Sequence, residues 1–154
     1  SGKTQMKKNL GMISMTYKDI YVAQVSLGAN AAATVKAFAE AEAYDGPAII
    51  IAYSHCIAHG FDMVQGLEQQ KIAVETGHFP LYRYNPALAA EGKNPLQLDS
   101  KAPTQSFAET AVQENRFKQL LKLNPNADAM LKKAEAGFRS NFDMLQALAN
   151  LPQK

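Results

Sequence analysis

The sequence predicts an α/β fold built on a parallel sheet, because strand-like and helix-like segments alternate along its first hundred residues. Strand-like segments lie at 20–27, 48–53 and 81–84, and helical segments at 31–44 and 63–76 separate them. The run at 48–53 is continuously apolar, which is typical of a central parallel strand that is covered on both faces. The end of the chain is different, since two helical segments follow one another there without a strand. We therefore expect an α/β unit over 1–103 and a helical extension over 104–154.

Capping residues support the elements of the first half. Asn9 and Asn30 are both placed to cap helices, the first short and the second at 31–44. Gly28 closes the first strand. The apolar face of the short helix is predicted to consist of Leu10, Ile13 and Tyr17.

The second half contains a long connection and two helices. Residues 85–103 hold three prolines and Gly92, so an extended connection is expected, with a short strand at Leu96–Leu98. Gln105–Leu123 and Ala127–Leu151 each have a helical pattern, and Asn124-Pro125-Asn126 separates them. These two helices predict an αα-hairpin that packs on the sheet or on a neighbouring domain.

Composition excludes several classes of protein. With 47% hydrophobic and 19% charged residues the chain is not of the disordered class. Its net charge of +2 comes from mixed acidic and basic residues, so no nucleic-acid or anionic-membrane partner is expected. The longest apolar run is far shorter than the ~20 residues that span a bilayer, no secretory signal opens the chain, and a single cysteine cannot form an internal disulfide. A cytoplasmic protein is expected, and the polar stretch Ser1–Lys8 looks like a cut edge.

The loop after the apolar strand is the candidate site. In open parallel sheets ligands bind beyond the carboxyl ends of the strands, and Ser54–Gly60 occupies that position. The loop holds the only cysteine, Cys56, between His55 and His59. Thiolate and imidazole both bind metals, so a mononuclear zinc site is one interpretation. A Cys–His nucleophile is another, although no orienting Asn or Asp can be assigned, and a buried cysteine that acts as a small hydrophobe is the third.

Other polar and aromatic residues have structural interpretations. Arg83, between two tyrosines, is placed either to pair with an anion or to stabilise a strand edge. The carboxylates that fall on predicted helix surfaces are expected to be solvated, namely Glu40, Glu42, Asp62, Glu68 and Glu75. The phenylalanines of the helical extension recur near helical spacing and are expected to pack, namely Phe107, Phe117, Phe138 and Phe142.

Six strings, in order along the chain, resemble the pyruvate:ferredoxin/flavodoxin oxidoreductases. The resemblance is collinear from about Lys7 to the end, and the spacing of the strings is similar to that of the family. The strings are Lys8–Met15, Tyr21–Asn30, Ala41–Pro47, Ile51–Gly60, Pro80–Pro86 and Glu91–Ser100.

The resemblance implies a fold, a reaction and one ligand. Residues 1–103 would be the C-terminal half of a doubly wound, parallel-sheet domain that binds thiamine diphosphate with Mg, and 104–154 its helical extension. The family oxidises pyruvate to acetyl-coenzyme A on thiamine diphosphate and passes electrons through iron-sulfur clusters to ferredoxin or flavodoxin. Cys56 would be the fourth thiolate of the 4Fe-4S cluster nearest the thiamine, the other three lying far upstream. The family is typically a homodimer.

The chain also departs from the family in ways that limit the expectation. The Gly-Asp-Gly motif that opens the thiamine site is absent, and pyruvate-contacting residues belong to other domains. Lys18-Asp19 replaces a small residue that usually precedes the first strand. We expect no catalytic residue here and no turnover by the chain alone. A non-catalytic α/β binding or assembly module, docking a partner through the sheet and the C-terminal helices, is the alternative of a different class.

Overall fold

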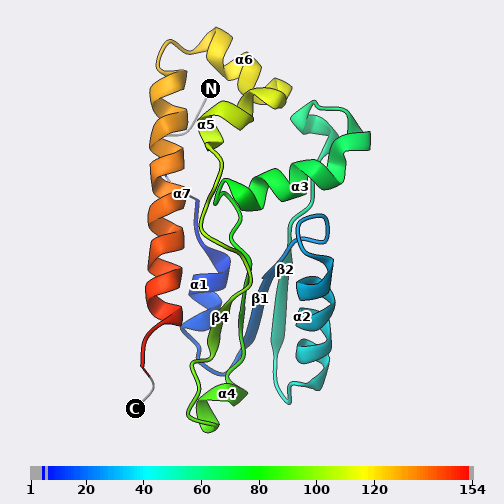
Figure 1. Ribbon diagram of the computed structural model, residues 1–154, viewed down its shortest axis with the longest axis vertical. Helices are drawn as coiled ribbons and strands as arrows, with labels where there is room; N and C mark the ends of the chain where they lie inside the picture. Colours follow the sequence, from blue (N-terminus) through cyan, green and yellow to red (C-terminus); the bar gives the residue numbers. More distant parts are fainter. Residues whose placement is uncertain (1–4, 6, 153–154) are drawn as a thin grey trace.

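The computed structural model describes residue 5 and residues 7–152, and shows a mixed sheet with helices on both faces (Figure 1). The strands are β1 (Tyr21–Val25), β2 (Ala48–Ala52), β3 (Tyr82–Tyr84) and β4 (Leu96–Leu98). Their order in the sheet is β2-β1-β3-β4. β1 and β2 are parallel, whereas β3 is antiparallel to both β1 and β4. The α/β class and all strand positions are therefore confirmed.

The expectation of a wholly parallel sheet is wrong, and the helix α3 (Gly66–Glu75) explains why. Instead of running back along the sheet, α3 lies across the carboxyl ends of β1 and β2 (Figure 1). The chain leaves α3 at that same edge, where the carbonyl of Pro80 accepts a hydrogen bond of 2.7 Å from Gln24 Nε2. β3 must start from the carboxyl edge, and it can only run antiparallel to β1.

The position of β2 also differs from the prediction. Its residues pair in register with β1, with Val22 opposite Ile49 and Gln24 opposite Ile51. Among the described residues no strand lies on its other side, so β2 is an edge strand. Its three isoleucines are half-buried and its two terminal alanines are exposed. A run with the composition of a central strand thus has an open edge in this chain.

The helix α2 (Ala31–Ala43) covers one face of the sheet. Tyr21, Ala23 and Val25 of β1 pack with Ala37 of this helix in one buried cluster. The predicted cap of α2 is confirmed, because Asn30 Oδ1 accepts a hydrogen bond of 3.0 Å from the Ala33 amide.

Two helices cover the opposite face, α1 (Leu10–Met15) and α7 (Ala127–Ala149) (Figure 1). Val22, Tyr82 and Leu96 of the sheet form a buried cluster with Leu145 of α7. The side chain of Asn9 caps α1 as predicted. The predicted apolar face of α1 is wrong, since Leu10, Ile13 and Tyr17 are exposed, and Met12 and Met15 pack against the cluster instead.

The C-terminal region is not the predicted two-helix hairpin. α7 is confirmed, but the segment before it is broken into α5 (Phe107–Thr110), the 3₁₀ helix η3 (Ala111–Gln113) and α6 (Asn115–Leu123). The break falls at Glu114, which has an extended backbone with φ −97° and ψ 130°. Phe107, Ala111 and Leu131 form the third buried cluster, with Phe117 and Phe138 packed against it. The packing role expected for these phenylalanines is confirmed.

Smaller elements complete the connections between strands. They are η1 (Ile57–His59), η2 (Met63–Gln65) and α4 (Ala87–Ala90). None of the helices in the described part of the chain is both long and apolar enough to span a membrane. Most of the predicted cut edge, Ser1–Thr4 and Met6, lies outside the described residues.

Arg83 pairs with anions inside the molecule. Its side chain is 6% exposed, and Nε and Nη2 donate to the two carboxylate oxygens of Asp99 at 2.7 and 2.9 Å. Nη1 donates to Glu40 Oε1 at 2.6 Å, and the second oxygen of Glu40 accepts from the hydroxyl of Tyr21. Arg83 is therefore structural, and the expectation of a solvated Glu40 is wrong.

Candidate functional site

The predicted site loop begins where the two parallel strands end. The amide of Tyr53 still donates to the carbonyl of Val25 at 2.9 Å, which holds the start of the loop to the end of β1. The chain then runs extended to Cys56 and turns through η1 to Gly60. The residues that follow both strands therefore lie at one edge of the sheet, as the geometry of parallel strands requires.

Cys56 is exposed, so the interpretation as a buried hydrophobe is wrong. Its backbone is extended, and its Sγ accepts a hydrogen bond of 3.4 Å from the Ala58 amide, which caps η1. Hydrogen bonds from amides to sulfur tune cysteine thiolates that bind iron-sulfur clusters. The thiol thus has a fixed direction and an open side.

His55 is held by the helix α3. Its Nδ1 lies 3.0 Å from Nε2 of Gln70. Gln70 Oε1 accepts from the Ser26 hydroxyl and from the Gly28 amide, so its Nε2 must be the donor to the imidazole. The neutral ring therefore carries its proton on Nε2, which lies against Gly66, where an added Cβ would be only 2.4 Å away.

Gln70 is a residue that the sequence did not indicate. Its side chain is buried, and it connects the end of β1, through Ser26 and Gly28, to the loop after β2, through His55. A glutamine on an amphipathic helix carries no signal of such a role, because its partners come from two other segments. The connection fixes the two strand ends relative to one another.

His59 faces the C-terminal helices instead of the thiol. Its Nδ1 lies 3.7 Å from Oε2 of Glu114, which also accepts a hydrogen bond from Arg116 Nε. Burial lowers the pKa of His59, and the Arg116 cation lowers it further, against the opposing effect of the Glu114 carboxylate. Glu114, only 9% exposed, is a second residue that the sequence did not indicate.

These partners do not support the zinc and nucleophile interpretations. Within residues 5 and 7–152, no three His, Cys, Asp or Glu side chains come together to hold a metal ion. His55 and His59 are turned to Gln70 and Glu114, and in this part of the chain no hydrogen bond joins the Cys56 thiol to an imidazole. Of the three residues in the predicted cluster, Cys56 alone is exposed, whereas the two histidines are half-buried.

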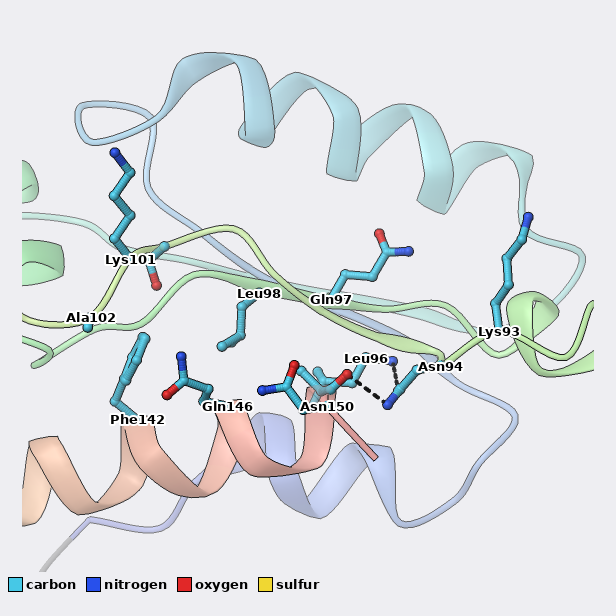
Figure 2. Close-up of a pocket in the computed structure, with 12 residues that line it drawn as sticks. Lys93, Asn94, Leu96, Gln97, Leu98, Lys101, Ala102, Phe142, Gln146 and Asn150 are labelled. Atoms are coloured by element: carbon cyan, nitrogen blue, oxygen red, sulfur yellow. Dashed lines mark hydrogen bonds between the residues drawn. The ribbon is translucent and has the colours of Figure 1, made fainter. Parts of the chain in front are cut away.

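A groove between β4 and α7 lies at the sheet edge opposite β2 (Figure 2). It is lined by Lys93, Lys101, Gln97 and Gln146, among others. Asn94 Nδ2 donates to the carbonyls of Leu148 and Ala149 at 2.8 and 3.0 Å and so satisfies the end of α7. Asn94 thus closes the helix, and no residue of the Cys56 loop lines this groove.

Comparisons with known proteins identify relatives over almost the whole chain. It is 54% identical over 151 residues to a pyruvate-flavodoxin oxidoreductase of Nostoc sp., which covers 97% of this chain and 13% of that protein. It is 47% identical over 149 residues to the pyruvate:ferredoxin oxidoreductase of Moorella thermoacetica, covering 96% of this chain and 13% of the relative. A mitochondrial pyruvate dehydrogenase [NADP(+)] of Euglena gracilis is 47% identical over 133 residues, or 85% of this chain and 7% of its own length.

No family model matches the chain. Its length corresponds to only 13% of the first relative, so the similarity concerns one segment of a much larger protein. The chain is homologous to a segment of the pyruvate-flavodoxin and pyruvate:ferredoxin oxidoreductases.

Proposed function

We propose that this chain is the end of the thiamine-diphosphate domain of a pyruvate:ferredoxin/flavodoxin oxidoreductase, and that Cys56 supplies one ligand to a 4Fe-4S cluster of that enzyme. The observation that carries the proposal is the exposed thiol of Cys56, held beyond the carboxyl end of β2 in a chain 54% identical to such an enzyme. That edge of a sheet is where α/β domains bind their ligands.

The donor set fits a shared cluster and excludes a complete one. Clusters of this type take four thiolates, and the sequence contains one cysteine. The other three would come from the remainder of the polypeptide. When bound, the cluster would move electrons singly from the thiamine to the acceptor protein, and this chain would hold one corner of it through Cys56 Sγ.

The open edge of β2 supports a place within a larger sheet. β2 has the apolar composition of a central strand but only one neighbour among the described residues. On the adjacent helix α2, Val35 and Phe38 are 66% and 55% exposed. An exposed apolar edge strand is a hazard in a free-standing protein. We infer that the remainder of the oxidoreductase covers this edge. We also infer that residues 1–103 are the end of its thiamine domain and that 104–154 are a helical extension of that domain.

The reaction itself belongs to the whole enzyme. Pyruvate, coenzyme A, thiamine diphosphate and the ferredoxin or flavodoxin acceptor would all contact other parts of the polypeptide. The residues of this chain would position the cluster thiolate. Turnover by the chain alone is not expected.

The test is the iron content of the full-length oxidoreductase with Cys56→Ser. We expect the variant to lose one four-iron cluster per protomer, because serine does not replace thiolate as a soft ligand. Ser54→Ala, two residues away in the same exposed loop, is the matched control and should keep all the iron. A Cys56→Ser enzyme with a full complement of iron would refute the ligand role.

A further inference from the structure

The loop of Cys56 is attached on its C-terminal side to the junction between η3 and α6. The amide of Asn115 donates to the carbonyl of Gly60 at 3.0 Å. One residue earlier, Glu114 Oε2 faces His59 Nδ1 at 3.7 Å, and Arg116 donates to the same carboxylate. The Arg116 guanidinium lies over the ring of Phe117, 4.6 Å from its centroid, which ties this group to the helical core.

The shape of Gly60 depends on the same junction. Its φ is +73°, in the left-handed region, and an added Cβ would lie 2.7 Å from Cβ of Asn115. Glycine is therefore required at this position for two reasons: the backbone of the turn is left-handed, and α6 approaches too closely for a side chain. The approach brings the Gly60 carbonyl within reach of the Asn115 amide.

The N-terminal side of the loop has a separate attachment. His55 is bound to Gln70 of α3, as described above. Both sides of Cys56 are thus attached to helical segments, through His55 before it and Gly60 after it. The side chain of Cys56 itself is exposed.

We propose that the η3–α6 junction, through the Asn115 amide and the close packing of Asn115 on Gly60, is a positioning element that fixes the loop carrying Cys56. This proposal deepens the function proposed above and rests on it for its consequence, since a fixed loop would hold the thiolate in one place relative to the cluster. The attachment itself stands on hydrogen bonds and packing within this chain. The helical extension would then contribute to the cluster site without donating a ligand.

The test uses a pair of substitutions at Asn115 in the full-length oxidoreductase. Asn115 is the first residue of α6, where proline is well tolerated, and Glu114 before it already has the extended backbone that proline requires. Asn115→Pro removes the amide donor to Gly60. Asn115→Ala keeps that donor and removes only the end of the side chain.

The readout is hydrogen exchange at the amides of His59 and Gly60, which donate to the carbonyls of Cys56 and Ile57. We expect Asn115→Pro to speed their exchange roughly 2- to 10-fold, the effect of losing one hydrogen bond, and Asn115→Ala to leave it unchanged. The low-temperature electron paramagnetic resonance spectrum of the reduced cluster should change in the proline variant alone. Equal exchange rates in the two variants would overturn the proposal.

A second measurement covers the case in which Asn115→Pro does not fold. In the wild-type enzyme the Asn115 amide, which donates to the carbonyl of Gly60, should exchange slowly. Unprotected exchange of this amide would equally overturn the proposal. Failure of the ligand role can be distinguished from failure of this proposal. The ligand role fails if Cys56→Ser retains all its iron, and that result would leave the hydrogen-exchange results unaffected.

Discussion

Replacing Asp99 by asparagine tests the energetics of the buried arginine most sharply. Asp99 is 14% exposed, and both of its oxygens accept hydrogen bonds from Arg83, whose side chain is 6% exposed. An asparagine has the same shape but one acceptor, and its amide group would face a guanidinium donor. The second partner of the arginine, Glu40, remains in place with its carboxylate 25% exposed.

The expected cost follows from these exposures. Removing one partner of a fully buried ion pair costs roughly 3–5 kcal/mol, because the remaining charge is left without compensation. Here Glu40 still compensates the arginine, and Asp99 has some contact with solvent. We therefore expect Asp99→Asn to lower the free energy of unfolding by about 2–3 kcal/mol.

Urea denaturation followed by circular dichroism measures this difference. With a slope of roughly 2 kcal/mol per molar urea, the midpoint should fall by about 1 M. The matched control is Asp128→Asn, which breaks an ion pair with Lys132 in which both side chains are more than two-thirds exposed, at 68% and 69%. Because solvent screens that exposed pair, this change should hardly move the midpoint. Equal midpoints for the two variants would refute the reasoning.

Three further predictions concern the loop and the aromatic cluster beside it. Gly60→Ala should destabilise the protein more than Gly92→Ala. Both glycines have positive φ, but only at Gly60 would the new Cβ meet a neighbouring side chain. Equal denaturation midpoints for the two variants would contradict this. Gln70→Leu should lower the free energy of unfolding by about 2–4 kcal/mol, because it leaves Ser26, Gly28 and His55 without their common hydrogen-bond partner. A denaturation midpoint like that of wild type would show that water replaces the glutamine. Burial, with a contribution from the Lys7 cation, lowers the pKa of His78 to about 4, so the unfolded chain, with a pKa near 6.5, takes up the proton first as pH falls. The stability that His78 contributes is complete above about pH 6.5 and is lost toward pH 4, by about 2 kcal/mol between pH 7 and 5. His78→Phe, which keeps a ring against Phe138, should flatten this dependence, and an unchanged slope would assign it to other groups.

The sequence predicted the elements whose signals are local. Asn9 and Asn30 cap the helices that they were expected to cap, and the run at 48–53 is a strand parallel to its predecessor. These features depend on a few consecutive residues, so a single sequence is sufficient to recognise them.

The features that were missed depend on distant contacts. The direction of β3 follows from the path of α3 across the strand ends, which no residue of β3 encodes. The break at Glu114 interrupts a good helical pattern at the point where the next amide, that of Asn115, donates to the distant carbonyl of Gly60. Likewise, the apolar composition of β2 predicted a central strand, whereas among the described residues this strand pairs with β1 alone.

The candidate site was located correctly, but its internal arrangement was not predictable. A loop after an apolar strand, with one cysteine, sufficed to place Cys56 at the sheet edge. Whether its two histidines faced the thiol depended on Gln70 and Glu114, which lie 14 and 58 residues further along the chain than Cys56. Their engagement elsewhere leaves the thiol as the open group.

Thiol labelling of the full-length oxidoreductase is the most direct test of the claim that Cys56 binds iron. The enzyme would be treated with a maleimide before and after its clusters are removed, and modification of the peptide that contains Cys56 measured by mass spectrometry. Because this thiol is exposed in the chain by itself, a bound cluster should be what protects it. The account predicts no labelling of Cys56 in the loaded enzyme and complete labelling after cluster removal. Stoichiometric labelling of Cys56 in an enzyme that keeps all its iron would contradict it.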